Sequence, residues 1–284
     1  MGIAKKKIAV VKKQTKIPRG KKQLKKKIDS QSKTQKIDQR KFLKTTIQGF
    51  DELLDNGIPL GSSVVLSGGP GTGKTIFSLQ LCHNLTQQGK KCLYMSFEEN
   101  KERLIEHMED FGWKPKEMIK QGKLYIERFN IFDVTRNVDA LLAKQKGELL
   151  IDINPVIAPK GFNPDIIILD SLTAIGSAFM GKQEHYRIYL EQLFRFFEKK
   201  KINSFLITEV EQHTGKISKL GVEEFLSDGV IMLYNFRKEN NRESAIEIIK
   251  MRGTKHNKKI VPMRINDKGI SVYADQDLYD VTHQ

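Results

Sequence analysis

The chain has 284 residues, of which 39% are hydrophobic, so it can bury one substantial core. Its apolar runs are far shorter than the roughly 20 residues that cross a bilayer, and no membrane span is expected. Cys82 and Cys92 lie in apolar contexts and predict two free thiols instead of a disulfide framework. Because the N-terminus also lacks a signal-peptide pattern, we expect a cytoplasmic protein.

The positive charge of the chain is concentrated at its N-terminus. Residues 1–44 contain 17 Lys or Arg and two acids, a balance of +15, and the whole chain is also +15 (49 minus 34). Residues 45–284 are therefore formally neutral. The basic segment contains no aromatic residue before Phe42, which predicts a disordered lysine-rich tail over 1–44 and one folded domain over 45–284. Such a tail can bind DNA, RNA or anionic lipid by counterion release, or serve only as a solubilising extension.

From residue 45 onward, short apolar segments alternate with longer segments of helical periodicity. A short amphipathic helix is expected over residues 49–54. Strands are expected at Ser63–Ser67, Cys92–Phe97, Leu124–Arg128, Ile166–Asp170 and Ser204–Thr208. Helices are expected at Lys74–Gln88, Lys101–Phe111, Val138–Lys146 and Glu184–Lys200. Because the strands are apolar on both faces and separated by helices, they predict an α/β fold with a mostly parallel sheet flanked by helices.

The last third of the chain has a different pattern, with few helical segments between its apolar stretches. Strands are expected there at Val230–Phe236, Ala245–Lys250, Val261–Asn266 and Ser271–Tyr273. Residues 267–269, with the sequence Asp-Lys-Gly, predict a hairpin turn between the last two. We expect these strands to be an antiparallel extension of the sheet. Residues 147–163 are expected to form a loop without a chemical role.

Residues 68–75 match the phosphate-binding pattern G-x-x-x-x-G-K-[ST] at every position. The residues of this P-loop are Gly68, Gly69, Pro70, Gly71, Thr72, Gly73, Lys74 and Thr75. Small residues let backbone N–H groups converge on phosphate oxygens at the positive end of the following helix. Lys74 is expected to reach the β- and γ-phosphates of ATP, and the Thr75 hydroxyl to bind Mg²⁺. A flexible glycine-rich loop is the alternative, but the position between an apolar strand and a helix favours phosphate binding.

Acidic residues follow two other predicted strands. Asp170 ends the strand that begins at Ile166, where a P-loop ATPase places the acid that holds hydrated Mg²⁺. Glu98 and Glu99 follow another strand, and a carboxylate there can orient or deprotonate the attacking water. These glutamates can instead favour the N-terminus of the next helix through its dipole. The residues alone leave both roles of Glu98 and Glu99 open.

Weaker candidates lie elsewhere in the chain. Thr208 and Glu209 end a further strand, where a γ-phosphate sensor is one of the roles open to them. Six histidines are scattered without metal-ligand spacing, which argues against zinc. His256 is a weak candidate for a subunit interface. The sequence Phe-Gly-Trp at 111–113 predicts a helix end packed on the core.

Together these segments resemble the KaiC-like branch of the RecA superfamily of ATPases, which also contains the RadA/Rad55-type recombinases. The resemblance covers residues 45 to about 273 and points to a single KaiC domain of the archaeal type. Besides the P-loop, it is carried by Gly-Phe-Asp-Glu-Leu-Leu at 49–54, Gly-Ile-Pro at 57–59, Tyr-Met-Ser-Phe-Glu-Glu at 94–99, Leu-Asp-Ser at 169–171, Gly-Val-Glu-Glu-Phe at 221–225, Asp-Gly-Val at 228–230 and Lys-Met-Arg-Gly-Thr-Lys-His at 250–256. The last of these is specific to the KaiC-like group.

The resemblance implies roles that the residues alone do not establish. It makes Glu98 and Glu99 the catalytic glutamates of an ATPase with ATP and Mg²⁺ as cofactors. It also implies that Lys250 and Arg252 reach the ATP of a neighbouring subunit and neutralise charge on the γ-phosphate, as an arginine finger does. Without it, both would be ordinary solvated strand residues. Nucleotide sites at subunit interfaces imply a homo-oligomer, either a hexamer or a related filament.

The chain also departs from the circadian clock member of this family, which carries two such domains where this chain has one. That member phosphorylates adjacent Ser and Thr residues near an interface. The matching place here is occupied by Glu224 and Phe225, and a glutamate is no phosphosite. Autokinase activity is therefore not expected, although Ser227 and Thr254 supply hydroxyls nearby.

Three functional hypotheses follow. The preferred one is an oligomeric ATPase that hydrolyses ATP slowly and acts as a nucleotide-driven regulatory switch. The alternative is a RadA-like DNA-binding ATPase of recombination or repair, whose basic tail contacts nucleic acid. A third is a nucleotide-binding scaffold with hardly any turnover, against which the presence of Glu98 and Glu99 argues.

Overall fold

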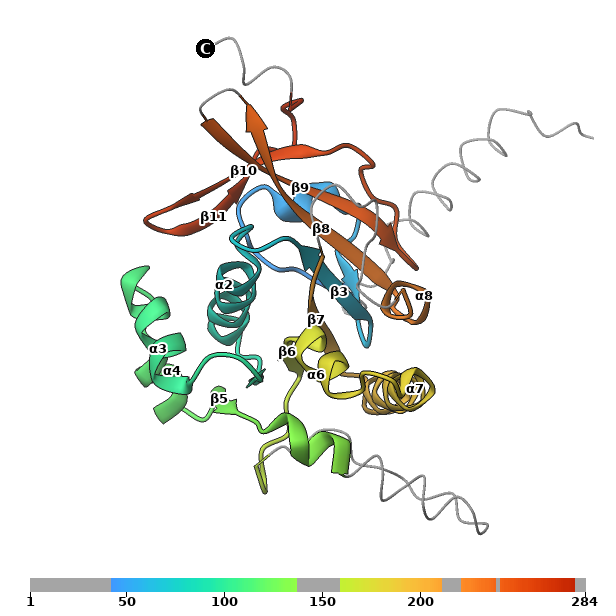
Figure 1. The fold of residues 1–284 in the computed structure, drawn as a ribbon. Coiled ribbons are helices and arrows are strands. Elements are labelled where there is room, and N and C mark those ends of the chain that lie inside the picture. Colours follow the sequence, from blue (N-terminus) through green and yellow to red (C-terminus); the bar gives the residue numbers. More distant parts are fainter. Residues whose placement is uncertain (1–41, 137–158, 211–220, 239–240, 279–284) are drawn as a thin grey trace, which may run out of the picture. The chain divides into compact units, whose positions relative to one another are not determined.

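The computed structural model describes residues 42–136, 159–210, 221–238 and 241–278 (Figure 1). Residues 1–41 of the expected tail, the expected helix Val138–Lys146 and most of the expected loop 147–163 lie outside these ranges. The chain divides into two units, Met1–Arg40 and Lys41–Gln284, and all of the described ranges lie in the second. Among the described residues, no helix is both long and apolar enough to cross a bilayer.

The centre of the fold is a sheet whose described strands follow the order β11-β10-β9-β8-β3-β7-β6-β4-β5. Their bounds are β3 Ser63–Gly68, β4 Cys92–Ser96, β5 Leu124–Arg128, β6 Ile166–Asp170, β7 Asn203–Glu209, β8 Gly229–Lys238, β9 Asn241–Met251, β10 Val261–Asn266 and β11 Gly269–Val272. The pairs from β8 through β3 to β5 are parallel, and β9, β10 and β11 add on antiparallel. The expected fold class is confirmed. In one detail the expectation was wrong, because β8 runs parallel to β3 and the antiparallel part begins only at β9.

Helices cover both faces of this sheet (Figure 1). They are α2 Lys74–Gln87, α3 Lys101–Asp110, α4 Pro115–Lys120, α6 Leu172–Ala178, α7 Gln183–Lys200 and α8 Glu223–Leu226. Ile166 and Ile168 of β6 belong to the core cluster with α2, α3 and α4, whereas Ile167 and Leu169 belong to the cluster with α6 and α7. This alternation buries β6 on both sides, which is why its sequence is apolar up to the final Asp170.

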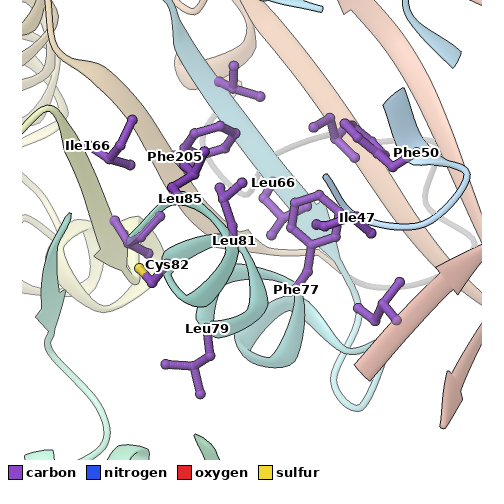
Figure 2. Packing of buried hydrophobic residues seen from close by; sticks show 14 of the residues in the cluster. Ile47, Phe50, Leu66, Phe77, Leu79, Leu81, Cys82, Leu85, Ile166 and Phe205 are labelled. Carbon is purple, nitrogen blue, oxygen red and sulfur yellow. The ribbon is translucent and has the colours of Figure 1, made fainter. Parts of the chain in front are cut away.

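The segment before β3 packs against the first helix of the domain. The expected amphipathic helix over 49–54 is a four-residue 3-10 helix, η2 (Phe50–Leu53), between the short paired strands β1 (Phe42–Leu43) and β2 (Ile58–Pro59). The ring of Phe50 meets that of Phe77 of α2 edge-on, with centroids 5.3 Å apart (Figure 2). These contacts bury one side of α2 and so fix the helix that follows the P-loop.

The C-terminal hairpin is fastened to the same helix by a side-chain amide. Gln80 of α2 accepts a hydrogen bond from the backbone N–H of Ile270 at 2.6 Å and donates to the Ile270 carbonyl at 3.1 Å. Both partners are buried, so these bonds satisfy polar groups that water cannot reach. The hairpin of β10 and β11 is thereby held beside α2.

Candidate functional site

The P-loop connects the end of β3 to the start of α2. Gly71 and Gly73 have φ angles of 73° and 94°, in the region that favours glycine. A Cβ on Gly68 would lie 2.7 Å from both the Leu233 carbonyl oxygen and Thr72 Oγ1, so this position has no room for a side chain. The glycines therefore permit the backbone turn of this loop, and the N-terminus of α2 follows it directly.

Lys74 lies over this loop. Its side chain is buried, and Nζ donates to the carbonyl oxygens of Gly68 at 3.0 Å and Gly69 at 2.9 Å. Glu209 Oε1 is 3.5 Å from the same amine, but the Glu209 side chain is 44% exposed, so this ion pair is weak. The Lys74 ammonium group is thus placed at the loop, where an incoming phosphate can replace its present partners.

Asp170 lies at the carboxyl end of β6, close to the P-loop. Its Oδ2 is 3.5 Å from Thr75 Oγ1 and accepts a hydrogen bond from the Tyr94 hydroxyl at 2.6 Å. Burial raises the pKa of Asp170 to about 6, the charges of Glu98 and Glu99 add to this rise, and the Tyr94 bond and Lys74 oppose it.

A hydroxyl beside a carboxylate is an oxygen donor set that fits a hard divalent cation such as Mg²⁺. Among the described residues no group of three or more His, Cys, Asp or Glu could enclose a metal. A cation at Thr75 and Asp170 would therefore need further oxygen ligands from nucleotide and water, as is usual for Mg²⁺.

We expect Asp170→Asn to stabilise the protein in the absence of nucleotide and metal at neutral pH. The folded pKa of about 6 exceeds the reference value of 3.8, so ionisation of Asp170 lowers the free energy of unfolding as pH rises through that window. A shift of about two units corresponds to about 3 kcal/mol, and we expect a gain of about 1–3 kcal/mol. Equilibrium unfolding in chelator checks this at about pH 7.5, where an equal or lower stability of the variant would contradict it. The gain should shrink as pH falls from about 6 and vanish below the reference pKa of 3.8, where the carboxyl is protonated in both states.

Glu98 is connected to Asp170 by Ser171, the residue that follows Asp170 in the chain. The Ser171 hydroxyl donates a hydrogen bond to Glu98 Oε1, and Ser171 Oγ accepts from the Ala174 backbone N–H at 3.1 Å as the N-cap of α6. At the end of β4, Ser96 Oγ accepts from the backbone N–H of Glu98 at 3.3 Å. The Glu98 carboxylate is thus held against the strand end that carries Asp170.

Glu99 is held by a different element. Its Oε2 lies 3.1 Å from His107 Nε2 and 3.3 Å from Arg103 Nε, both on α3. The N-cap of α3 is Asn100, whose side chain accepts from the Arg103 backbone N–H at 3.0 Å. The two neighbouring carboxylates therefore occupy different environments, Glu98 toward Asp170 and Glu99 toward α3.

Thr208 and Glu209 lie at the same edge of the sheet as the P-loop, since they pair with Ser67 and Gly68 of β3. Thr173 of α6 connects them, because its Oγ1 accepts from the Glu209 backbone N–H at 2.7 Å and lies 3.3 Å from Thr208 Oγ1. The structure thus brings together the P-loop, Glu98, Asp170, Thr208 and Glu209.

Lys250 and Arg252 lie at the opposite edge. Lys250 pairs with Val230, which in turn pairs with Val65 near the start of β3, whereas the P-loop follows the end of that strand. Val65 and Gly68 are three residues apart, which is about 10 Å along the strand at about 3.3 Å per residue, and Lys250 lies a further two strands across the sheet. The two basic side chains therefore lie far from the P-loop of their own chain.

Backbone oxygens hold Lys250 in place. Its Nζ donates to the carbonyls of Glu224 at 2.9 Å and Ser227 at 2.5 Å. Burial and the neighbouring charge of Arg252 lower the pKa of Lys250. Arg252 is more exposed and lies 3.5 Å from both Asp228 Oδ1 and the Phe225 carbonyl. The side chain of Phe225 is 75% exposed, so this edge presents an aromatic ring beside two cationic groups.

The weak candidate His256 follows this segment. Its backbone forms an isolated bridge with Leu54, and its Nε2 is buried without a hydrogen-bond partner in the described part of the chain. His256 therefore belongs to the segment after β9 that packs against the end of η2.

The sequence interpretation missed Tyr94, Ser171 and His107. A signal for Tyr94 was available, because Ser96 pairs with Asp170 and a residue two positions earlier in β4 lies on the same face. The contacts of Ser171 and His107 depend on how α6 and α3 pack. The alternation of side chains along a strand gives no information about that packing.

Comparison with known proteins adds independent evidence. A family model described as "ATPase: KaiC" matches residues 43–277. The circadian clock oscillator protein KaiC of Prochlorococcus marinus (strain MIT 9313) is 33% identical over 238 residues, which cover 81% of this chain and 46% of that protein. The KaiC of Synechococcus elongatus is 30% identical over 242 residues, 81% of this chain and 44% of that protein. The chain thus spans less than half the length of these relatives.

A solved structure matches over nearly its full length. The crystal structure of a KaiC-like protein from the hyperthermophilic archaeon Pyrococcus horikoshii has a TM-score of 0.67 and 31% sequence identity. The match covers 82% of this chain and 98% of that one. The described fold therefore corresponds to a single KaiC-like domain.

Proposed function

Because the chain belongs to the KaiC family of RecA-like ATPases, we propose that it hydrolyses ATP slowly at interfaces between identical subunits, as a nucleotide-driven regulatory switch. One observation carries the proposal. The P-loop, Glu98 and Asp170 lie at one edge of the sheet, and Lys250 and Arg252 lie at the other. The site becomes complete only when the edge of one copy that carries Lys250 and Arg252 meets the P-loop edge of another copy.

Each residue then has a defined part. Backbone N–H groups of the P-loop, to which Pro70 contributes none, bind the phosphates, and Lys74 leaves the loop carbonyls to contact the β- and γ-phosphates. Thr75 and Asp170, the latter partly through water, hold Mg²⁺, which neutralises phosphate charge when bound. Glu98 orients the attacking water and accepts its proton, while Glu99 supports that end of β4 from α3.

The assembly follows from this arrangement. An interface that joins two different edges is head-to-tail, and it must close into a ring or continue as a filament. We propose a closed homo-oligomer, with a hexamer as the expected size. Clock-type autophosphorylation is not part of the proposal, because Glu224 stands at the matching place.

The steady-state rate of ATP hydrolysis by the full chain tests the proposal. We expect a slow rate that depends on Mg²⁺. The rate per subunit should rise with protein concentration as the assembly forms. The Lys74→Ala variant should lose the activity, because the P-loop loses its charged phosphate contact. A rate per subunit that does not change from dilute monomer to assembled protein would argue against interface sites.

A second candidate function is favoured by the charge of residues 1–44, with 17 basic and two acidic residues. In this case the protein is a DNA-binding ATPase, and its tail contacts phosphates through counterion release. We expect DNA affinity to fall by about 10³–10⁵-fold between 50 and 200 mM salt if six to ten phosphates are contacted.

The tail hypothesis predicts that deletion of residues 1–40, which leaves β1 and its pairing with β2 in place, abolishes DNA binding but leaves ATP hydrolysis without DNA intact. Fluorescence anisotropy with single- and double-stranded DNA measures binding, and the ATPase rate with and without DNA measures coupling. Strong stimulation of ATP hydrolysis by DNA would put this function first. An ATPase rate indifferent to DNA at both salt concentrations would leave the switch in place and reduce the tail to a tether or a solubility device.

A further inference from the structure

Tyr94 brings a hydroxyl to the Asp170 carboxylate from inside the sheet. It is the third residue of β4, and its side chain is fully buried. The hydroxyl donates to Asp170 Oδ2 at 2.6 Å, a short hydrogen bond typical of a charged acceptor. Because Ser96 pairs with Asp170, Tyr94 and Asp170 lie on the same face of neighbouring strands, the face covered by α2.

This hydrogen bond fixes which oxygen of Asp170 is engaged. The Tyr94 hydroxyl and the Thr75 hydroxyl both lie at Oδ2 of this carboxylate. Asp170 is only 5% exposed, so bulk water is a poor substitute for the Tyr94 hydroxyl.

We propose that Tyr94 is a positioning residue for Mg²⁺, whose hydroxyl holds the Asp170 carboxylate in the orientation that binds the cation beside Thr75. The inference rests on the proposed role of Asp170 and Thr75. A phenylalanine would fill the same space in this core, so packing alone does not require the hydroxyl. Outer-shell hydrogen bonds of this kind change metal affinity by about 10–100-fold when they are removed.

The Tyr94→Phe variant tests this role with two separate binding measurements. The affinity for a fluorescent ATP analogue in EDTA should stay within about twofold of the wild type, because the P-loop is unchanged, and this binding also shows that the variant is folded. The Mg²⁺ concentration that gives half of the metal-dependent gain in nucleotide affinity should rise by about tenfold. ATP hydrolysis should recover toward the wild-type rate at saturating Mg²⁺.

Tyr186→Phe is the matched control. The Tyr186 hydroxyl donates to Glu223 Oε1 at 2.8 Å, and both residues are buried. Glu223 precedes β8, at the edge of the sheet away from the P-loop. Removal of this hydroxyl should lower the melting temperature about as much as Tyr94→Phe does. It should leave the Mg²⁺ titration unchanged.

Three outcomes decide the matter. A shifted Mg²⁺ titration for Tyr94→Phe that disappears in an Asp170→Asn background supports the inference, because the effect then passes through Asp170. An unshifted titration for Tyr94→Phe, with a clear effect of Asp170→Asn alone, overturns the role of Tyr94 and leaves the proposed function standing. An unchanged titration for Asp170→Asn overturns the proposed Mg²⁺ site and this inference with it.

Discussion

Replacing Glu98 with Gln should lower the single-turnover rate of ATP hydrolysis by about 10²–10⁴-fold, while ATP affinity stays within about threefold of the wild type. Glutamine keeps the size of the side chain and can still accept the hydrogen bond from Ser171, so the local structure should persist. It cannot accept a proton from the attacking water. The loss should therefore appear in the chemical step and not in nucleotide binding.

The neighbouring glutamate provides the control. Glu99→Gln should lower the rate by no more than about tenfold, because its carboxylate is held by His107 and Arg103 of α3. Rapid-quench measurements of one turnover on preassembled protein would compare the two variants directly. Equal losses in Glu98→Gln and Glu99→Gln would show that the pair acts as a unit, and a larger loss in Glu99→Gln would reverse the assignment.

Much of the fold could be predicted because its strands are buried on both faces. Ile166–Asp170 is apolar apart from its last residue, and it is a central strand with core clusters on either side. The direction of β8 could not be predicted in the same way. Gly229–Lys238 looks like the first strand of an antiparallel meander, but its pairing with β3 depends on how the chain returns across the sheet.

The candidate site divides along similar lines. The P-loop and Asp170 could be located because each follows an apolar strand, and the ends of parallel strands meet at one edge. The different surroundings of Glu98 and Glu99 could not, because they depend on the hydroxyl that caps α6 and on two side chains of α3. The edge on which Lys250 lies is equally a matter of topology, since it follows from β9 running antiparallel to β8.

The same topology places the segment of Arg252 away from the P-loop of its own chain. If Arg252 acts on the ATP of a neighbouring subunit, Arg252→Ala should lower the hydrolysis rate by about 10³-fold or more, as loss of an arginine finger does. Lys74→Ala should be inactive for a different reason, because its own P-loop fails. Each variant lacks one half of every interface site, so either protein alone should be nearly inactive.

Mixing the two inactive variants should restore activity. In a randomly mixed 1:1 assembly, about one quarter of the interfaces join an intact P-loop edge to an intact Arg252 edge, so about a quarter of the wild-type rate is expected. A mixture of Lys74→Ala with Glu98→Gln is the matched control, because both changes damage the same edge and no intact site can form. Native mass spectrometry would verify that subunits exchange. If mixed assemblies form and the rate does not recover, Arg252 does not act across the interface; if it recovers only in the first mixture, the ATP site is built from two copies of this chain.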